Sequence, residues 1–440
     1  MNAIKSAAPS PASMHEAAAT APLPPQRPRV AEVDWLRMLI VLAIIPYHAL
    51  ILFSAASATV LQNATTSAQL PIIFGALEAW GIPLIFLLAG ASSKFALDAR
   101  PPATYVKERI FRLLVPVLLV MLVFAPLRAY YLLLSNPGLI SVSPAPIPHP
   151  EDLRNIGAFF QQYLTSLLTT GSPIVVRNSL AHLWFVPRLL IASIICLPLF
   201  LFLRARWPEW MRRLASSRIP MGALLLGGGF VPAVLVALLQ PGWLHRLTAN
   251  LPLNEDWTSF ALEVVVFIYG YLIYSSVELR SAVRRLAPLL LLLAAACWTI
   301  VFVVRLGGHT PPNTFSLANA LFSLVQVFAI WLLVAGVLGL GMRYLTRTTR
   351  WQTYLTTATF PVYILHLPLL TIIAYYLRAL PVPRFVLLAL IAGLTLGASF
   401  ALYEFVVRRV PFIRLLFGLN SQRPPAPGSG RRTLSSTAGS

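Results

Sequence analysis

Long hydrophobic segments separated by short polar ones run through most of the chain. A helix needs about 20 apolar residues to cross the hydrocarbon core of a bilayer. Segments of that kind are predicted at residues 35–56, 71–96, 111–134, 182–203, 219–240, 258–277, 286–305, 315–341, 353–377 and 385–407. The pattern predicts an all-α polytopic membrane protein with about ten transmembrane helices.

The two ends of the chain differ from this central region. Residues 1–30 are rich in Ala and Pro and contain no apolar core, so they do not resemble a signal peptide. Residues 419–440 contain mainly small and polar residues together with Arg. We expect a disordered tail at each end and a membrane domain over residues 31–418. Between two predicted spans, an outer loop with an amphipathic stretch near 151–170 is expected to lie on the membrane surface or to cover an outer cavity.

The distribution of Lys and Arg predicts the orientation of the chain. If the N-terminus is inside, roughly three-quarters of the 34 Lys and Arg fall on the inner side. This bias favours an even number of spans, with both termini in the cytoplasm. The net charge of +20 therefore reflects membrane topology, because 58% of the residues are hydrophobic and only 11% are charged. Nucleic-acid binding is not expected, and Cys196 and Cys297 offer no metal-binding spacing.

Arg37 and His48 are ionisable residues within the first hydrophobic segment. Eleven helical steps of about 100° are roughly three turns, so both side chains lie on one helix face, about 16 Å apart along the axis. Ionisable residues inside a membrane are costly and usually functional. His48 suits a general base, although it could also donate to a neighbouring helix. Arg37 suits the binding of an anionic substrate, and it could also form a local ion pair with Asp34, one turn earlier.

Further polar side chains lie in or beside the later hydrophobic segments. Arg109 and Arg112 are neighbours on one helix face and suit phosphate binding, although positive-inside charge also explains such a pair. His182 either binds an outer acceptor or is structural. His366, between Pro361 and Pro368, either lines a cavity with His48 or ties helices together. Glu404 precedes Arg408 by four residues, which favours an ion pair along the helix.

These residues, taken in order, resemble the acyltransferase-3 family of integral membrane acyltransferases. The resemblance covers about residues 31–418. It rests on Arg-x10-His in the first segment, Arg-x-x-Arg before the third, His182-Leu-Trp-Phe, and Tyr-Ile-Leu-His366. The segment Phe360-Pro-Val-Tyr-Ile-Leu-His is most similar to the branch that includes the periplasmic-glucan succinyltransferase.

The resemblance implies transfer of an acyl group such as acetyl or succinyl from a cytoplasmic acyl-CoA to a hydroxyl, often on a cell-surface carbohydrate. It implies that His48 is the essential histidine, Arg37 its partner, and Arg109 and Arg112 the cytoplasmic pair. We expect a bacterial inner-membrane enzyme with acyl-CoA as co-substrate and no bound cofactor or metal. A transporter of an anionic or acylated compound is the alternative, because intramembrane His and Arg also suit a substrate path. A lipid-linked sugar transferase would need acidic loop motifs, and the few loop carboxylates form none.

Overall fold

The computed structural model describes residues 30–53, 70–136, 155–170, 181–215, 220–238, 257–312, 314 and 316–419. The predicted tails lie almost entirely outside the described residues. Within the described part, every regular element is a helix. The prediction of an all-α protein is therefore confirmed.

The helices follow the predicted hydrophobic segments closely. They are α2 (Ala31–Ile51), α3 (Leu70–Ala99), α4 (Pro102–Leu119), α5 (Ala125–Ser135), α6 (Ile156–Thr170), α7 (Phe185–Ile195), α8 (Leu197–Ala215), α9 (Met221–Gly228), α10 (Phe230–Leu238), α12 (Trp257–Tyr274), α13 (Val277–Leu306), α14 (Leu317–Tyr344), α15 (Arg350–Leu377), α16 (Arg384–Leu402) and α17 (Pro411–Leu416). A π-helical turn, η1 (Val120–Phe124), joins α4 to α5, and another, η5 (Tyr403–Val407), continues α16. A 3₁₀ turn, η4 (Ala181–Trp184), leads into α7.

Several of these helices are long and apolar enough to cross a membrane. Seven described segments pass that test, and an eighth does so if the bent pair 182–195 and 197–214 is one span. Two shorter apolar helices, Met221–Val236 and Thr258–Tyr274, add to them. The length and hydropathy of these helices are therefore those of an integral membrane protein.

Three helix ends lie more than two turns outside the predicted segments. α4 begins at Pro102 rather than near 111, and α8 ends at Ala215 rather than near 203. α13 begins at Val277, well before the expected residue 286. The Ser276 hydroxyl accepts a hydrogen bond from the Leu279 amide and caps the helix, and Glu278 lies in its first turn. Arginines in the first turns of α13 lower the local hydropathy, so the apolar pattern alone placed the start too late.

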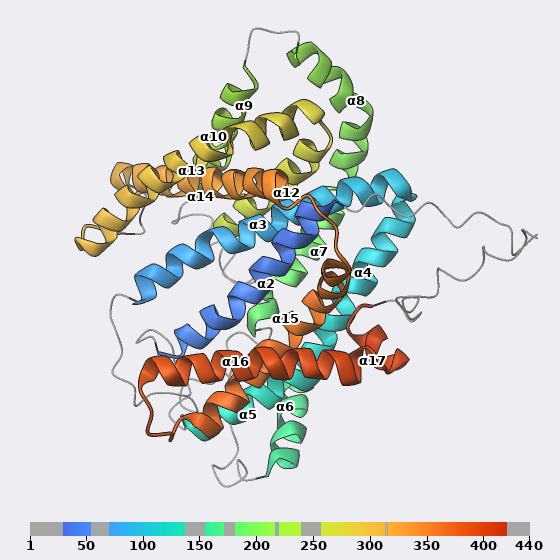
Figure 1. The fold of residues 1–440 in the computed structure, drawn as a ribbon, viewed down its shortest axis with the longest axis vertical. Helices are drawn as coiled ribbons and strands as arrows, with labels where there is room; N and C mark the ends of the chain where they lie inside the picture. Colours follow the sequence, from blue (N-terminus) through green and yellow to red (C-terminus); the bar gives the residue numbers. More distant parts are fainter. Residues whose placement is uncertain are drawn as a thin grey trace, which may run out of the picture.

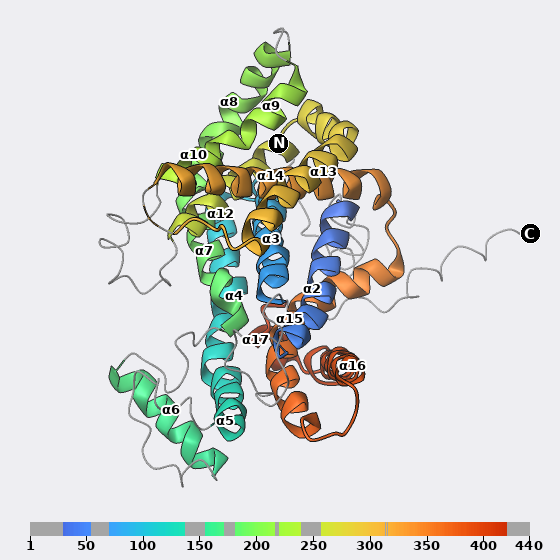
Figure 2. The ribbon, with the colours of Figure 1, turned by 90° about the vertical axis from the view of Figure 1, so that its left-hand side faces the viewer.

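The helices form neighbouring pairs that surround α2. α13 packs along α14, α3 packs against α12, and α15 packs against both α16 and α2. Figures 1 and 2 show α13 and α14 on one side of the molecule and α16 on the other, with α2, α3 and α15 between them. The predicted amphipathic stretch is α6, which packs against α5.

Small residues allow α3 and α12 to approach closely. A Cβ atom on Gly90 would lie 1.9 Å from the carbonyl oxygen of Phe267, and one on Gly270 would lie 1.9 Å from that of Leu87. Without a hydrophobic effect between helices in lipid, such close van der Waals contact is a main source of association. The crossing fixes the part of α3 that carries the Ser92 and Ser93 side chains.

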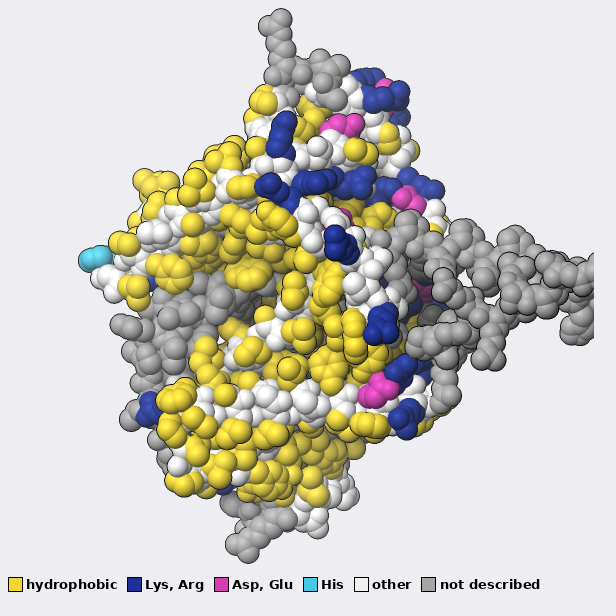
Figure 3. All heavy atoms as spheres, viewed as in Figure 1, with side chains coloured by type: hydrophobic (Ala, Val, Ile, Leu, Met, Phe, Trp, Pro, Cys, Tyr) yellow, Lys and Arg dark blue, Asp and Glu magenta, His cyan; other side chains and the backbone are white. Residues whose placement is uncertain are grey.

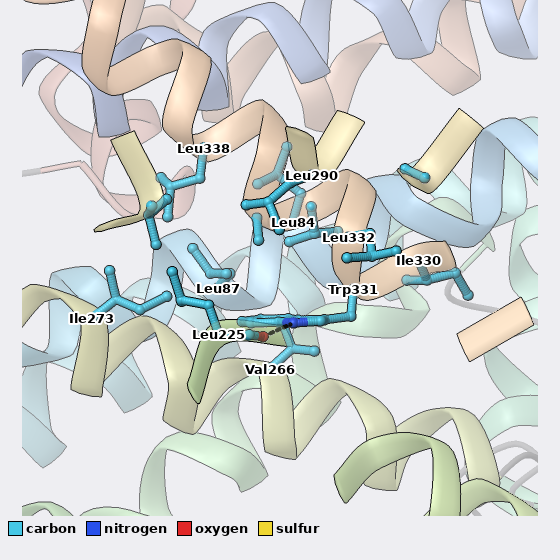
Figure 4. Packing of buried hydrophobic residues seen from close by; sticks show 14 of the residues in the cluster. Leu84, Leu87, Leu225, Val266, Ile273, Leu290, Ile330, Trp331, Leu332 and Leu338 are labelled. Atoms are coloured by element: carbon cyan, nitrogen blue, oxygen red, sulfur yellow. Dashed lines mark hydrogen bonds between the residues drawn. The ribbon is translucent and has the colours of Figure 1, made fainter. Parts of the chain in front are cut away.

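A large hydrophobic cluster fills the space between α3, α9, α12, α13 and α14. Trp331 lies in this cluster, and its indole N–H donates to the carbonyl oxygen of Leu225, with a donor–acceptor distance of 2.8 Å (Figure 4). Gly229, at the break between α9 and α10, faces the Phe328 and Trp331 rings so closely that a Cβ there would clash. The absence of a side chain at Gly229 therefore lets α9 and α10 pack closely against α14.

The surface is strongly divided between hydrophobic and basic regions. Figure 3 shows a broad hydrophobic face, with Lys and Arg side chains gathered toward one edge and the upper part. The connections between α3 and α4, between α12 and α13, and between α14 and α15 are short and have arginines in or beside them. One end of several helices is therefore basic, as the positive-inside rule expects of a cytoplasmic end.

Candidate active site

Three histidines from distant parts of the sequence meet in one cluster. His48 lies near the end of α2, His182 in η4 and His366 in α15. The ring centroids are 5.1 Å apart for His48 and His366, 4.6 Å for His182 and His366, and 6.3 Å for His48 and His182. His182 and His366 are buried, whereas His48 is partly buried. His366 thus contacts His48 and ties α15 to α2. Its role in lining a cavity stays a prediction.

The hydrogen bonds of this cluster define which ring nitrogens carry protons. Nδ1 of His366 contacts the carbonyl oxygen of Tyr363, which can only accept, so this nitrogen carries the proton. In neutral His366, Nε2 is then an acceptor, and it lies 2.9 Å from Nδ1 of His48. His48 therefore donates through Nδ1 and keeps a lone pair on Nε2, which is the form that a general base requires.

His182 and Tyr363 fix each other by two hydrogen bonds. Nε2 of His182 donates to the Tyr363 carbonyl oxygen over 2.8 Å, and the Tyr363 hydroxyl donates to the His182 carbonyl oxygen. Nδ1 of His182 is fully buried and has no hydrogen-bond partner. Since Nε2 carries the proton, this Nδ1 is an unsatisfied acceptor beside His48 and His366.

The histidine cluster does not have the arrangement of a metal centre. His182 and His366 both direct an N–H toward the Tyr363 carbonyl, so their rings do not point lone pairs at one position. Among the described residues, no group of three His, Cys, Asp or Glu side chains could hold a metal ion. The geometry instead supports proton transfer through His48.

Arg37 and Arg109 bind adjacent serines on α3. Arg37 donates to the Leu88 carbonyl oxygen over 2.8 Å and to the Ser92 hydroxyl over 2.6 Å. Arg109 donates to the Ser93 hydroxyl over 2.9 Å, and the Tyr105 hydroxyl donates to the same oxygen. Their bonding partners are neutral, so these contacts orient the guanidinium groups without cancelling their charge.

The two guanidinium groups are close enough to repel each other, and Asp34 is close enough to attract that of Arg37. Asp34 thus interacts with Arg37, as its position one turn earlier suggested. A like-charged pair in partly buried surroundings favours an anionic ligand between or beside the two groups. Arg37 lies about three turns from His48 on the same continuous helix.

Arg112 does not share the surroundings of Arg109. Its side chain is exposed on α4, and its backbone packs against Gly418 after α17. Residues three apart lie on one broad helix face, but only Arg109 reaches the serine pair on α3. A role for Arg112 in donor binding stays a prediction.

Glu404 forms the ion pair that its spacing favours. Its carboxylate accepts two hydrogen bonds from Arg408, at 2.7 and 2.9 Å, and another from the Tyr354 hydroxyl at 3.0 Å. Arg408 directly follows η5, and Tyr354 lies in α15, more than three turns before His366. The contacts give Glu404 a structural role.

Several residues of the site were not predicted from sequence. Ser92 and Ser93 are ordinary in an apolar helix, and Tyr363 entered only as part of the Tyr-Ile-Leu-His motif. Only the tertiary structure shows that they bind Arg37, Arg109 and His182. Arg128 was not singled out from the sequence, yet it interacts electrostatically with His48 and His182. A lone Arg inside a hydrophobic segment was the signal available for it.

Comparison with known proteins identifies the class of molecule to which this site belongs. The chain matches the family model of the acyltransferase domain over residues 30–404, and it belongs to the acyltransferase-3 family. It is therefore an acyltransferase with membrane-spanning helices. No curated protein and no solved structure gives a match. Family membership favours an enzyme over the transporter considered as the alternative.

Proposed function

We propose that this protein is a membrane O-acyltransferase that moves an acyl group from a cytoplasmic acyl-CoA to a hydroxyl on a surface or periplasmic carbohydrate. The observation that carries the proposal is the hydrogen-bond chain from Tyr363 through His366 to His48. It gives His48 a free Nε2 lone pair inside an apolar helix bundle. A lone pair in that position suits removal of a hydroxyl proton.

In the proposed reaction, Nε2 of His48 takes the proton as the acceptor oxygen attacks the thioester carbonyl carbon. The new C–O bond produces a tetrahedral intermediate with a negative oxygen. When the C–S bond breaks, the thiolate leaves and His48 returns the proton to sulfur. His366 holds Nδ1 of His48 throughout, so the imidazole keeps the correct tautomer and orientation.

Arg37 and Arg109 would bind the anionic part of the donor. Acyl-CoA carries several phosphate groups, and guanidinium groups bind phosphate through paired hydrogen bonds. The separation of about 16 Å between Arg37 and His48 suits an extended donor whose thioester reaches the histidines. Arg112, exposed on the same helix as Arg109, would contact a more outlying part of the donor.

The proposed topology has ten membrane crossings, with both termini in the cytoplasm of a bacterial inner membrane. Seven long segments and the bent pair would supply eight crossings, and the proposal assigns the other two to the shorter apolar helices. The basic ends of α8, α13 and α14 would then face the cytoplasm, where the donor is available. The carbohydrate acceptor, and a dicarboxylic acyl group such as succinyl, rest on the resemblance of Phe360–His366 to the glucan succinyltransferase branch.

The test is mass spectrometry of surface and periplasmic glycans from cells that lack this protein or express it. We expect an acyl mass increment only with the active protein. His48→Ala should lower acyl transfer by about 10²–10⁴-fold, the usual contribution of general acid–base catalysis. His309→Ala is the matched control, because His309 is exposed after α13. Near-normal transfer by a correctly inserted His48→Ala protein would contradict the proposal.

A further inference from the structure

Arg128 lies at the level of the histidine cluster, on a third helix. It belongs to α5, one turn before Leu132. Leu132 packs in a buried cluster with Ala49 and Leu52 at the end of α2 and with Leu367 of α15. Ala49 directly follows His48, Leu52 lies one turn after it, and Leu367 directly follows His366. The side chain one turn earlier on the same face of α5 is therefore placed beside these histidines.

The local structure of α5 favours this placement. The π-helical turn η1 ends at Phe124, just before α5 begins. A π-helical turn shifts the rotational register of the residues that follow, and such turns are frequent at functional sites. It therefore helps determine which face of α5 carries Arg128 and Leu132.

Arg128 has no counter-charge among the described residues. Its Nε atom is fully buried without a hydrogen-bond partner. None of the carboxylates in the described part of the chain forms an ion pair with it. A charged guanidinium inside a membrane segment is costly unless it is paired. Within this part of the chain, no anion offsets that cost.

The histidines beside Arg128 indicate at which step of the proposed reaction a negative charge would form near it. Its positive charge acts on both His48 and His182. Proton transfer to His48 would create a second positive charge nearby, which is unfavourable in an apolar site. Attack of a hydroxyl on a thioester creates a negative oxygen at the same moment. A guanidinium in this position would stabilise that oxygen when it forms close to it.

We propose that Arg128 is a catalytic residue that binds the oxyanion of the tetrahedral intermediate formed beside His48. This inference rests on the proposed function. The guanidinium N–H groups donate to the former carbonyl oxygen while the C–O bond forms, and they release it when the C–S bond breaks. The unsatisfied Nδ1 of His182 accepts a hydrogen bond from the substrate.

The experiment measures kcat and KM of purified protein in liposomes with labelled acetyl-CoA and succinyl-CoA and the glycan fraction as acceptor. Arg128→Gln should lower kcat by about 10²–10³-fold, as loss of one oxyanion donor does, and leave the donor KM near the wild-type value. Arg128→Lys keeps the charge and should recover part of the rate. Arg305→Gln is the control, because Arg305 is a partly buried arginine that hydrogen-bonds to Gln326 on α14. Size-exclusion elution and melting temperature establish that each variant is folded.

The possible outcomes separate this inference from the proposed function. Wild-type protein that transfers no label overturns both. Active wild-type protein with an unchanged kcat for Arg128→Gln overturns only the oxyanion role. A raised KM confined to succinyl-CoA would mean that Arg128 binds the carboxylate of the acyl group, which also overturns it. A fall in kcat with both donors, partly recovered by Lys, supports it.

Discussion

At the scale of single residues, the site depends on the Tyr363 carbonyl oxygen. This one acceptor receives N–H groups from His182 and His366 and so fixes the proton position on both rings. The tautomer of His366 then sets that of His48 through the 2.9 Å contact between them. In the proposed mechanism His366 is a positioning residue, because it holds the proposed base without needing to contact the substrate.

Replacement of His366 tests this positioning role. His366→Phe keeps a ring of similar shape but offers no acceptor to Nδ1 of His48. We expect kcat to fall by about 10²–10⁴-fold, with the donor KM unchanged because Arg37 and Arg109 are intact. His366→Gln can place an amide oxygen near the same position and should retain more activity than His366→Phe. Equal activity of Phe and wild-type protein in the transfer assay would contradict the role.

At the scale of helices, the crossing of α3 and α12 supports the donor end of the site. Gly90 contacts the α12 backbone, and the carbonyl oxygens of the two residues just before it, Leu88 and Ala89, accept hydrogen bonds from Arg37 and Arg109. A change in the distance between the two helices would therefore move the carbonyls and serines that orient both arginines. Helix packing and donor binding are coupled through this short segment of α3.

Gly90→Ala should separate the two helices, because the new Cβ would lie 1.9 Å from the Phe267 oxygen. We expect a loss of about 1–3 kcal/mol or more in stability, the usual effect of overpacking. The measurement is thermal denaturation in detergent, together with the donor KM, which should rise. Gly81→Ala in the same helix is the control, since nothing lies within 4 Å of its Cβ position. Equal melting temperatures for the two variants would refute the expectation.

At the scale of the whole molecule, the basic and apolar surfaces predict the orientation in the membrane. Exposed Thr346 lies in the connection between α14 and α15, beside Arg343 and Arg347. Exposed Thr310 follows the opposite end of α13. Because the inner side of a membrane protein collects Lys and Arg, these two positions are expected on opposite sides.

Cysteine labelling tests that orientation. In a protein with Cys196→Ala and Cys297→Ala, a cysteine at position 310 should react with a membrane-impermeant maleimide added to intact spheroplasts. A cysteine at position 346 should react only after the membrane is permeabilised. The background protein without cysteines should give no signal. Labelling in the reverse order would show that the basic ends face outward and that the donor cannot reach Arg37 from the cytoplasm.

The sequence by itself determined the positions of the apolar helices and the residues from which a site could be built. Hydropathy, charge and helical spacing are local properties, and they identified His48, Arg37, His182 and His366 without any tertiary information. Local spacing also indicated the Glu404–Arg408 ion pair, which the structure contains.

Only the tertiary structure decided which of those residues meet. His48 and His366 are 318 positions apart, and a chain can bring such residues together only through the packing of intervening helices. The same packing directs Arg109 toward Ser93, leaves Arg112 exposed, and places Arg128 beside the histidines. Helical periodicity says which residues share a face, but the neighbouring helices decide what that face contacts.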